Sequence, residues 1–117
     1  MDEVVVGAKL RLENISKEAS YARAKEFLMK RRAKQPRENS VGSVFKNGAL
    51  PAGKLIEDCG LKGLQIGGAK ISEIHANFIV NTGEATAKDF LALVQIAEKE
   101  VKKKFNIQLE REFVLLE

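Results

Sequence analysis

A short stretch of small and polar residues is the part of the sequence best suited to bind or transform a ligand. It runs from Ser40 to Asn47 and combines the hydroxyl of Ser43 with Gly42 and the cation of Lys46. Small residues beside a hydroxyl let a ligand approach the backbone closely, and a lysine and an amide add hydrogen-bond donors. The same composition is also typical of a polar turn, in which the serine only satisfies the local backbone.

A second candidate is Glu112, near the end of the chain. Alternation of apolar and polar residues predicts a strand over residues 107–115, and the alternation puts Gln108 and Glu110 on the same face as Glu112. A carboxylate on that face lies either at an exposed rim or in a cleft. The pattern alone favours the rim.

Several kinds of chemistry are excluded by residue counts. The sequence has one histidine, His75, and one cysteine, Cys59, which are too few for a metal site, an intrachain disulfide or a recognisable serine triad. Gly67-Gly68 lacks the G-x-G-x-x-G spacing of a dinucleotide loop. A lone cysteine and the lack of any long apolar run indicate a cytoplasmic protein without a membrane span.

Charge raises one alternative function. The net charge is +4, from 20 basic and 16 acidic residues, and basic residues cluster at 30–37 and 102–104. The first cluster could bind the phosphate groups of a nucleic acid, so a nucleic-acid-binding module is an open alternative. The modest charge, the absence of Trp and the single Tyr argue against it. We therefore expect no nucleic-acid partner.

The first half of the chain is predicted to contain a strand, two helices and a loop. Alternation predicts a strand over residues 4–12, and Ser16 is a good N-cap for a helix to about Arg32. That helix has an apolar stripe made by Tyr21, Ala24, Phe27 and Leu28. Pro36 begins a loop with a short extended piece at residues 43–45. A short helix follows Pro51 and stops at Gly60.

The second half is predicted to contain short strands and one long helix. Residues 64–66 and 69–71 flank the two glycines as a sharp turn, and residues 78–80 form a buried strand. Thr86 with Asp89 is a capping signature for a helix that ends at Asn106. The whole order predicts an α+β fold: a single compact domain with a small mixed or antiparallel sheet and about three helices.

Many short blocks of this sequence resemble, in the same order, the C-terminal domain of the UDP-N-acetylenolpyruvoylglucosamine reductase (MurB) family. The blocks are Lys34–Pro36, Gly42–Asn47, Ala52–Glu57, Gly60–Gly63, Gln65–Ala69, Ser72–Glu73, His75–Asn81, Ala85–Asp89 and Leu109–Glu112. Two positions depart from the family pattern: Gly48 replaces a usual proline, and Asn106 replaces a usual glycine. The resemblance implies that residues 15–117 are the substrate-binding domain. Residues 1–14 would be a leading strand that loosely matches the end of the family's flavin-binding region.

The resemblance also implies a reaction and its cofactors. The family reduces UDP-N-acetylglucosamine enolpyruvate to UDP-N-acetylmuramate in peptidoglycan synthesis, with NADPH as reductant and FAD as carrier. We expect the flavin-binding part to be missing or separate. This chain alone is then expected to hold neither cofactor and to be inactive. A stand-alone interaction module that binds a separate partner chain is the second alternative.

The resemblance assigns roles to six residues. Ser43 is the expected proton donor and Glu112 a second catalytic residue. Lys34 and Asn47 match positions that contact the UDP-sugar substrate. Lys62 and His75 match positions near the family's active site, although a lone histidine is more often a structural hydrogen-bonding residue.

Overall fold

The computed structural model describes residues 3–116 and contains three helices and four strands in this part of the chain. In chain order these are α1 (Lys17–Lys34), β1 (Ser40–Ser43), α2 (Ala52–Asp58), β2 (Gln65–Ile66), β3 (Ala69–Ile71), β4 (Phe78–Asn81) and α3 (Ala87–Phe105). The predicted α+β class, with about three helices and a small antiparallel sheet, is confirmed. Contacts divide the chain into one unit up to Lys30 and a second unit from Arg31 onward.

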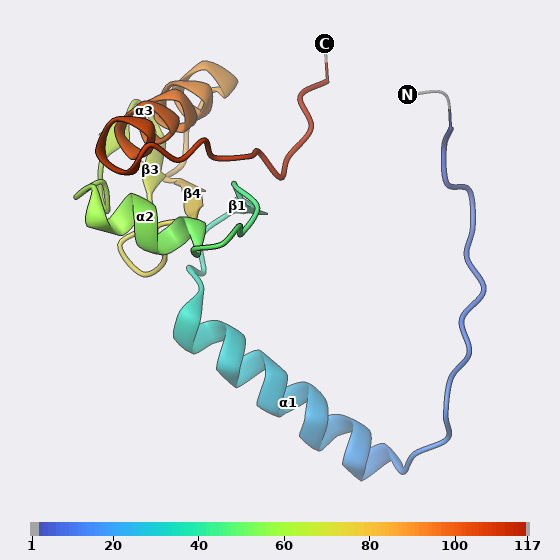
Figure 1. The fold of residues 1–117 in the computed structure, drawn as a ribbon. Coiled ribbons are helices and arrows are strands. Elements are labelled where there is room, and N and C mark those ends of the chain that lie inside the picture. The colour runs from blue at the N-terminus through green and yellow to red at the C-terminus, as the bar shows by residue number, and fades with distance from the viewer. Residues whose placement is uncertain (1–2, 117) are drawn as a thin grey trace. The chain divides into compact units, whose positions relative to one another are not determined.

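The second unit is built on a four-stranded sheet in the order β1-β4-β3-β2, with every pair antiparallel. Helix α3 packs against β2 and β3, and α2 packs against α3 (Figure 1). The apolar core lies among these elements. Its largest fully buried apolar side chains are Val44, Phe45, Ile56, Ile71, Leu93, Val94 and Val101. Burial of such side chains supplies most of the driving force for folding this unit.

Helix α3 begins and ends where the sequence predicts. The Thr86 side chain accepts a hydrogen bond from the Asp89 N–H at 3.1 Å, and the Asp89 carboxylate accepts one from the Thr86 N–H at 3.0 Å. This reciprocal pair satisfies two otherwise free N–H groups of the first turn. At the other end Asn106 takes the left-handed conformation, with φ 55°. Both predicted caps are confirmed.

The glycine pair at 67–68 forms the turn of the β2–β3 hairpin, as predicted. Its tight fit has a tertiary cause. A Cβ on Gly68 would lie 2.3 Å from the Ala85 backbone nitrogen, so only glycine lets the turn approach the start of α3.

Two predictions for the N-terminal residues are corrected. Residues 3–14 form no strand, and apolar side chains such as Val5 and Val6 are exposed. Alternation alone cannot make a strand, because a strand needs a neighbour for its backbone hydrogen bonds. Helix α1 does form, with Ser16 Oγ accepting from the Ala19 N–H at 3.1 Å. Its predicted apolar stripe is exposed and buries no residue.

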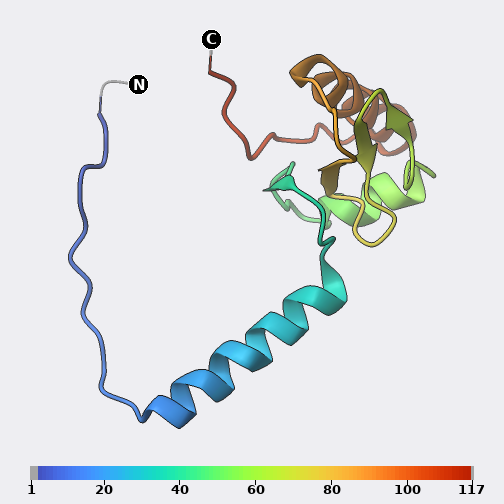
Figure 2. The same cartoon turned by 180° about the vertical axis from the view of Figure 1, so that it is seen from behind.

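Two further strand predictions are corrected in their bounds. Strand β1 ends at Ser43, so the predicted extended piece at 43–45 lies at and beyond its end. The predicted strand at 107–115 is reduced to an isolated bridge between Arg111 and Phe45. Figure 2 shows this C-terminal segment, after α3, returning toward β1. Among the helices of residues 3–116, none is long and apolar enough to cross a membrane.

Candidate functional site

Ser43 is placed at the end of β1 by a β-bulge. The β1–β4 pairing shifts register between Ser40, which faces Val80, and Ser43, which faces Phe78. Between these two pairs β1 advances by three residues and β4 by two, so β1 contains one extra residue. Gly42, with φ 84°, provides the backbone conformation that this bulge needs. Bulges redirect the side chain that follows them and are common beside functional sites. Here the bulge leaves Ser43 exposed at the strand end.

The chain just after Ser43 is fixed by the buried side chain of Asn77. Its Oδ1 accepts from the Phe45 N–H at 3.0 Å, and its Nδ2 donates to the Phe45 carbonyl at 2.9 Å. The Val44 N–H also donates to the Asn77 carbonyl at 2.9 Å. Asn77 is only 2% exposed, so these bonds are shielded from water. The amide therefore holds the backbone of residues 43–47, the Ser43 loop, at a defined place.

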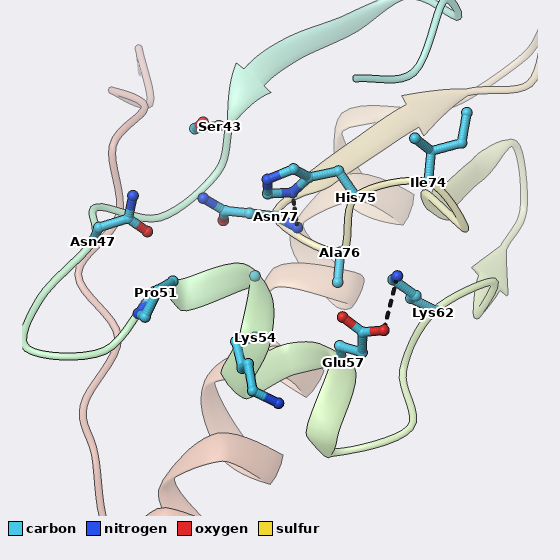
Figure 3. Close-up of a pocket in the computed structure, with 11 residues that line it drawn as sticks. Ser43, Asn47, Pro51, Lys54, Glu57, Lys62, Ile74, His75, Ala76 and Asn77 are labelled. Atoms are coloured by element: carbon cyan, nitrogen blue, oxygen red, sulfur yellow. Dashed lines mark hydrogen bonds and ion pairs between the residues drawn. The ribbon is translucent and has the colours of Figure 1, made fainter. Parts of the chain in front are cut away.

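A pocket of about 210 Å³ opens beside this loop (Figure 3). Four of the six predicted site residues line it: Ser43, Asn47, Lys62 and His75. They come from β1, the loop before α2, the loop before β2 and the turn before β4. In the close-up, Ser43 and Asn47 lie on one side of the pocket and Lys62 on the other.

His75 lies in the middle of the site and is half-buried. Its Nδ1 accepts a hydrogen bond from the Asn77 N–H at 3.1 Å, and its ring meets Phe78 edge-on at 5.0 Å between centroids. In the neutral ring this leaves the proton on Nε2, where it can be donated to a ligand. The histidine thus has a structural contact on one nitrogen and a free donor on the other.

The polar side chains at the two ends of the pocket already make hydrogen bonds or ion pairs within the protein. Asn47 Oδ1 accepts from the Ala52 N–H, at the start of α2, at 3.0 Å. Lys62 Nζ forms an ion pair with Glu57 at 3.0 Å. Lys54 adds a second cation, and its hydrogen bond to Asp58 raises the pKa of the lysine. Both lysines are paired with carboxylates, but each ammonium carries three N–H donors and can still donate to an anionic ligand.

The other two predicted residues lie outside this pocket. Lys34 is exposed at the end of α1. Glu112 is also exposed, but its N–H donates to the Val44 carbonyl at 2.8 Å. Glu112 is therefore attached to the residue that follows Ser43, although its side chain does not line the pocket.

Sequence reasoning did not identify Asn77, Gly53, Lys54 or Glu57 as site residues. Asn77 was visible as a polar residue directly before the apolar run Phe78–Val80, a place where a buried side chain must be hydrogen-bonded. Nothing in sequence spacing signals the others. Across residues 3–116 there is no group of three His, Cys, Asp or Glu side chains suited to hold a metal ion.

Comparison with known proteins relates the chain to one family. The family model described as "UDP-N-acetylenolpyruvoylglucosamine reductase, C-terminal domain" matches residues 35–116. The reductase of Chloroherpeton thalassium is 46% identical over 97% of this chain, and that of Caldicellulosiruptor bescii is 55% identical over 77%. The crystal structure of the reductase (MurB) from Thermus caldophilus matches 89% of the chain, with a TM-score of 0.71 and 43% identity.

The match covers only part of each relative. The chain spans 40% of the Chloroherpeton protein, 29% of the Caldicellulosiruptor protein and 38% of the Thermus chain.

Proposed function

This chain belongs to the UDP-N-acetylenolpyruvoylglucosamine reductase family through that enzyme's C-terminal domain, and from this premise we propose that it forms the substrate side of such an active site. The reaction is the reduction of UDP-N-acetylglucosamine enolpyruvate to UDP-N-acetylmuramate, a cytoplasmic step of peptidoglycan synthesis. The supporting observation is the convergence of Ser43, Asn47, Lys62 and His75 on one pocket.

FAD and NADPH are the cofactors of the proposed intact enzyme, and the pocket does not fit them. At about 210 Å³ it is below the ~300–1,000 Å³ that drug-sized ligands occupy, so it accommodates only part of a substrate. We assign both cofactors to a flavin-binding part outside this chain. A flavin held there would supply the hydride that the reduction needs.

In this proposal Ser43 supplies the proton. Once hydride has added, negative charge develops on the neighbouring carbon and its carboxylate, and the Ser43 hydroxyl donates its proton to that carbon. Water then returns a proton to the serine oxygen. A hydroxyl is a weak acid in water, but a fixed position next to a strongly basic carbon, with cations nearby, makes the transfer effective. The bulge at Gly42 and the Asn77 amide support this by fixing the Ser43 loop.

The remaining residues bind the substrate or stabilise its charge. We propose that Lys34, Lys62, Asn47 and His75 hold the UDP-sugar, with the cations acting on its diphosphate or carboxylate. Glu112 acts at the carboxylate-bearing end or in the proton relay. This role is supported by its backbone bond to Val44, next to Ser43.

The test is Ser43→Ala in an enzyme that joins this chain to a flavin-binding part. Reduction of the flavin by NADPH should keep its rate, because the serine acts only on charge formed later. Reoxidation of the flavin by the enolpyruvyl substrate should slow by roughly 10²–10⁴-fold, the usual effect of losing a positioned acid. Ser43→Cys should retain more activity than Ser43→Ala, since a thiol still donates a proton. Stopped-flow absorbance follows the two half-reactions separately.

Ser20→Ala is the matched control, because Ser20 is an exposed serine of α1 that does not line the pocket. It should leave both half-reactions at their normal rates. The chain without the flavin-binding part should be colourless. If Ser43→Ala reoxidises the flavin at nearly the normal rate, Ser43 is a loop residue and the proposed role is wrong.

A further inference from the structure

The segment that carries Glu112 is joined to the Ser43 loop by a short antiparallel contact. The Lys46 N–H donates to the Glu110 carbonyl at 2.8 Å, and the Glu112 N–H donates to the Val44 carbonyl at 2.8 Å. Arg111 lies opposite Phe45 between these two bonds. A one-residue slip of this contact would place a different side chain at the position of Glu112.

Two backbone bonds at an exposed edge are a weak attachment, since such edges open readily. The lysine pair that accompanies them adds little. Lys46 and Glu110 are 51% and 71% exposed, and solvent screens surface pairs of this kind. Another contact must fix the segment if Glu112 is to keep a defined place.

Arg111 makes that contact with helix α3. Its Nε lies 2.6 Å from Glu98 Oε1 and its second guanidinium nitrogen lies 3.0 Å from Oε2, a two-point pairing. The Glu98 side chain is 19% exposed, so water screens this pair less than the lysine pair. Two parallel bonds fix orientation as well as distance, which a single lysine contact does not.

Aromatic packing supports the same arrangement. The Arg111 guanidinium lies over the Phe113 ring at 5.8 Å, and Phe113 meets Phe90 of α3 edge-on at 5.0 Å. The segment is thus anchored to α3 on both sides of Glu112.

We propose that Arg111 is a positioning residue, which by binding Glu98 sets the register of residues 110–112 and holds Glu112 beside the Ser43 loop. The inference rests on the proposed function, in which Ser43 and Glu112 act on the same substrate. Arg111 itself has no contact with the reacting atoms in this scheme. It acts through the place that it gives to Glu112.

The first test uses amide hydrogen exchange, measured by NMR on the 117-residue chain. Arg111→Ala should speed exchange at the Lys46 and Glu112 amides by about tenfold or more, because these donate the two bonds of the contact. The amides of Ile71 and Ser72, bonded within the sheet region, are the internal controls and should not change. The charge-swapped pair Glu98→Arg with Arg111→Glu should restore slow exchange at Glu112.

The second test measures flavin reoxidation in an enzyme that joins this chain to a flavin-binding part. Arg111→Ala and Glu112→Gln should both slow this half-reaction and spare flavin reduction, and the charge-swapped pair should recover the rate. Unchanged exchange at Glu112 in Arg111→Ala, or equal acceleration at every amide, overturns the positioning role. If exchange responds as expected but Glu112→Gln reoxidises flavin at the normal rate, the proposed role of Glu112 is wrong while Arg111 still sets the register.

Discussion

At the scale of single residues, Gly53 lies close against the His75 ring in the pocket lining. A Cβ added there would lie 2.8 Å from Cε1 and 3.2 Å from Nδ1 of His75. The ring cannot move away freely, because its Nδ1 accepts from the Asn77 N–H and the ring packs edge-on with Phe78. The position of His75 therefore depends on a glycine in a neighbouring helix.

Gly53→Ala should lower stability by roughly 1–3 kcal/mol, the usual cost of overpacking. An alanine in a helix otherwise gains about 0.5–1 kcal/mol over glycine, so a loss would report the clash. Thermal unfolding gives the stability, and imidazole NMR signals give the ring position unambiguously, since the chain has one histidine. Gly48→Ala, where a Cβ meets open space, is the control and should be harmless. A stable Gly53→Ala variant with unshifted imidazole signals would contradict this account.

At the scale of elements, the start of α3 is the junction that joins the helix to the sheet. The Asp89 carboxylate accepts from the Thr86 N–H inside the helix cap and from the Gly68 N–H of the β2–β3 turn. The bond to the Thr86 backbone is the main cause that lowers the pKa of Asp89, followed by the bond to the Thr86 side chain. A charged Asp89 therefore stabilises both elements.

This junction should make stability depend on pH. Because the pKa of Asp89 is lower in the folded state, its contribution is complete above the ordinary aspartate pKa of about 3.9 and is lost as pH falls through the lower folded value. The free energy of unfolding, measured by chemical denaturation, should therefore fall more between about pH 5 and 2 in the wild type than in Asp89→Asn. Glu38→Gln is the control for removing one charge, because Glu38 is an exposed carboxylate. Parallel pH profiles for the wild type and Asp89→Asn would show that the carboxylate has no such role.

At the scale of the whole molecule, the buried apolar core is confined to the unit from Arg31 onward. Every buried hydrophobic residue lies between Val44 and Leu109, whereas α1 and the residues before it bury none within the described range. Stability measured on the chain is then the stability of one unit.

A variant that begins at Arg31 should therefore unfold cooperatively with nearly the same melting temperature, within about 2–3 °C. A shift of that size corresponds to well under 1 kcal/mol for a domain of this length. Circular dichroism during heating measures the transition. Before heating, the helical signal of the variant should be smaller than that of the full chain, because most of α1 is removed. A variant that melts far lower or without a sharp transition would show that residues before Arg31 support the core.

The sequence by itself determined the helix caps and the glycine turn of this protein. The caps of α3 at Thr86 and Asn106 and the glycine turn at 67–68 follow from hydrogen bonds and backbone conformations within a few residues. The family was also visible in the sequence, because its motifs are short and keep their order. The roles of the six predicted site residues come from that resemblance.

Only the tertiary structure decided which of these features meet. It brings Ser43, Asn47, Lys62 and His75 to one pocket and shows that Asn77, 32 residues away from Phe45, fixes the loop. It also leaves residues 3–14 without a strand partner, although their alternation equals that of a real strand. The reason is that a strand pair, a buried hydrogen-bonding side chain such as Asn77 and a pocket all depend on contacts between distant segments. Local periodicity does not indicate which segments make those contacts.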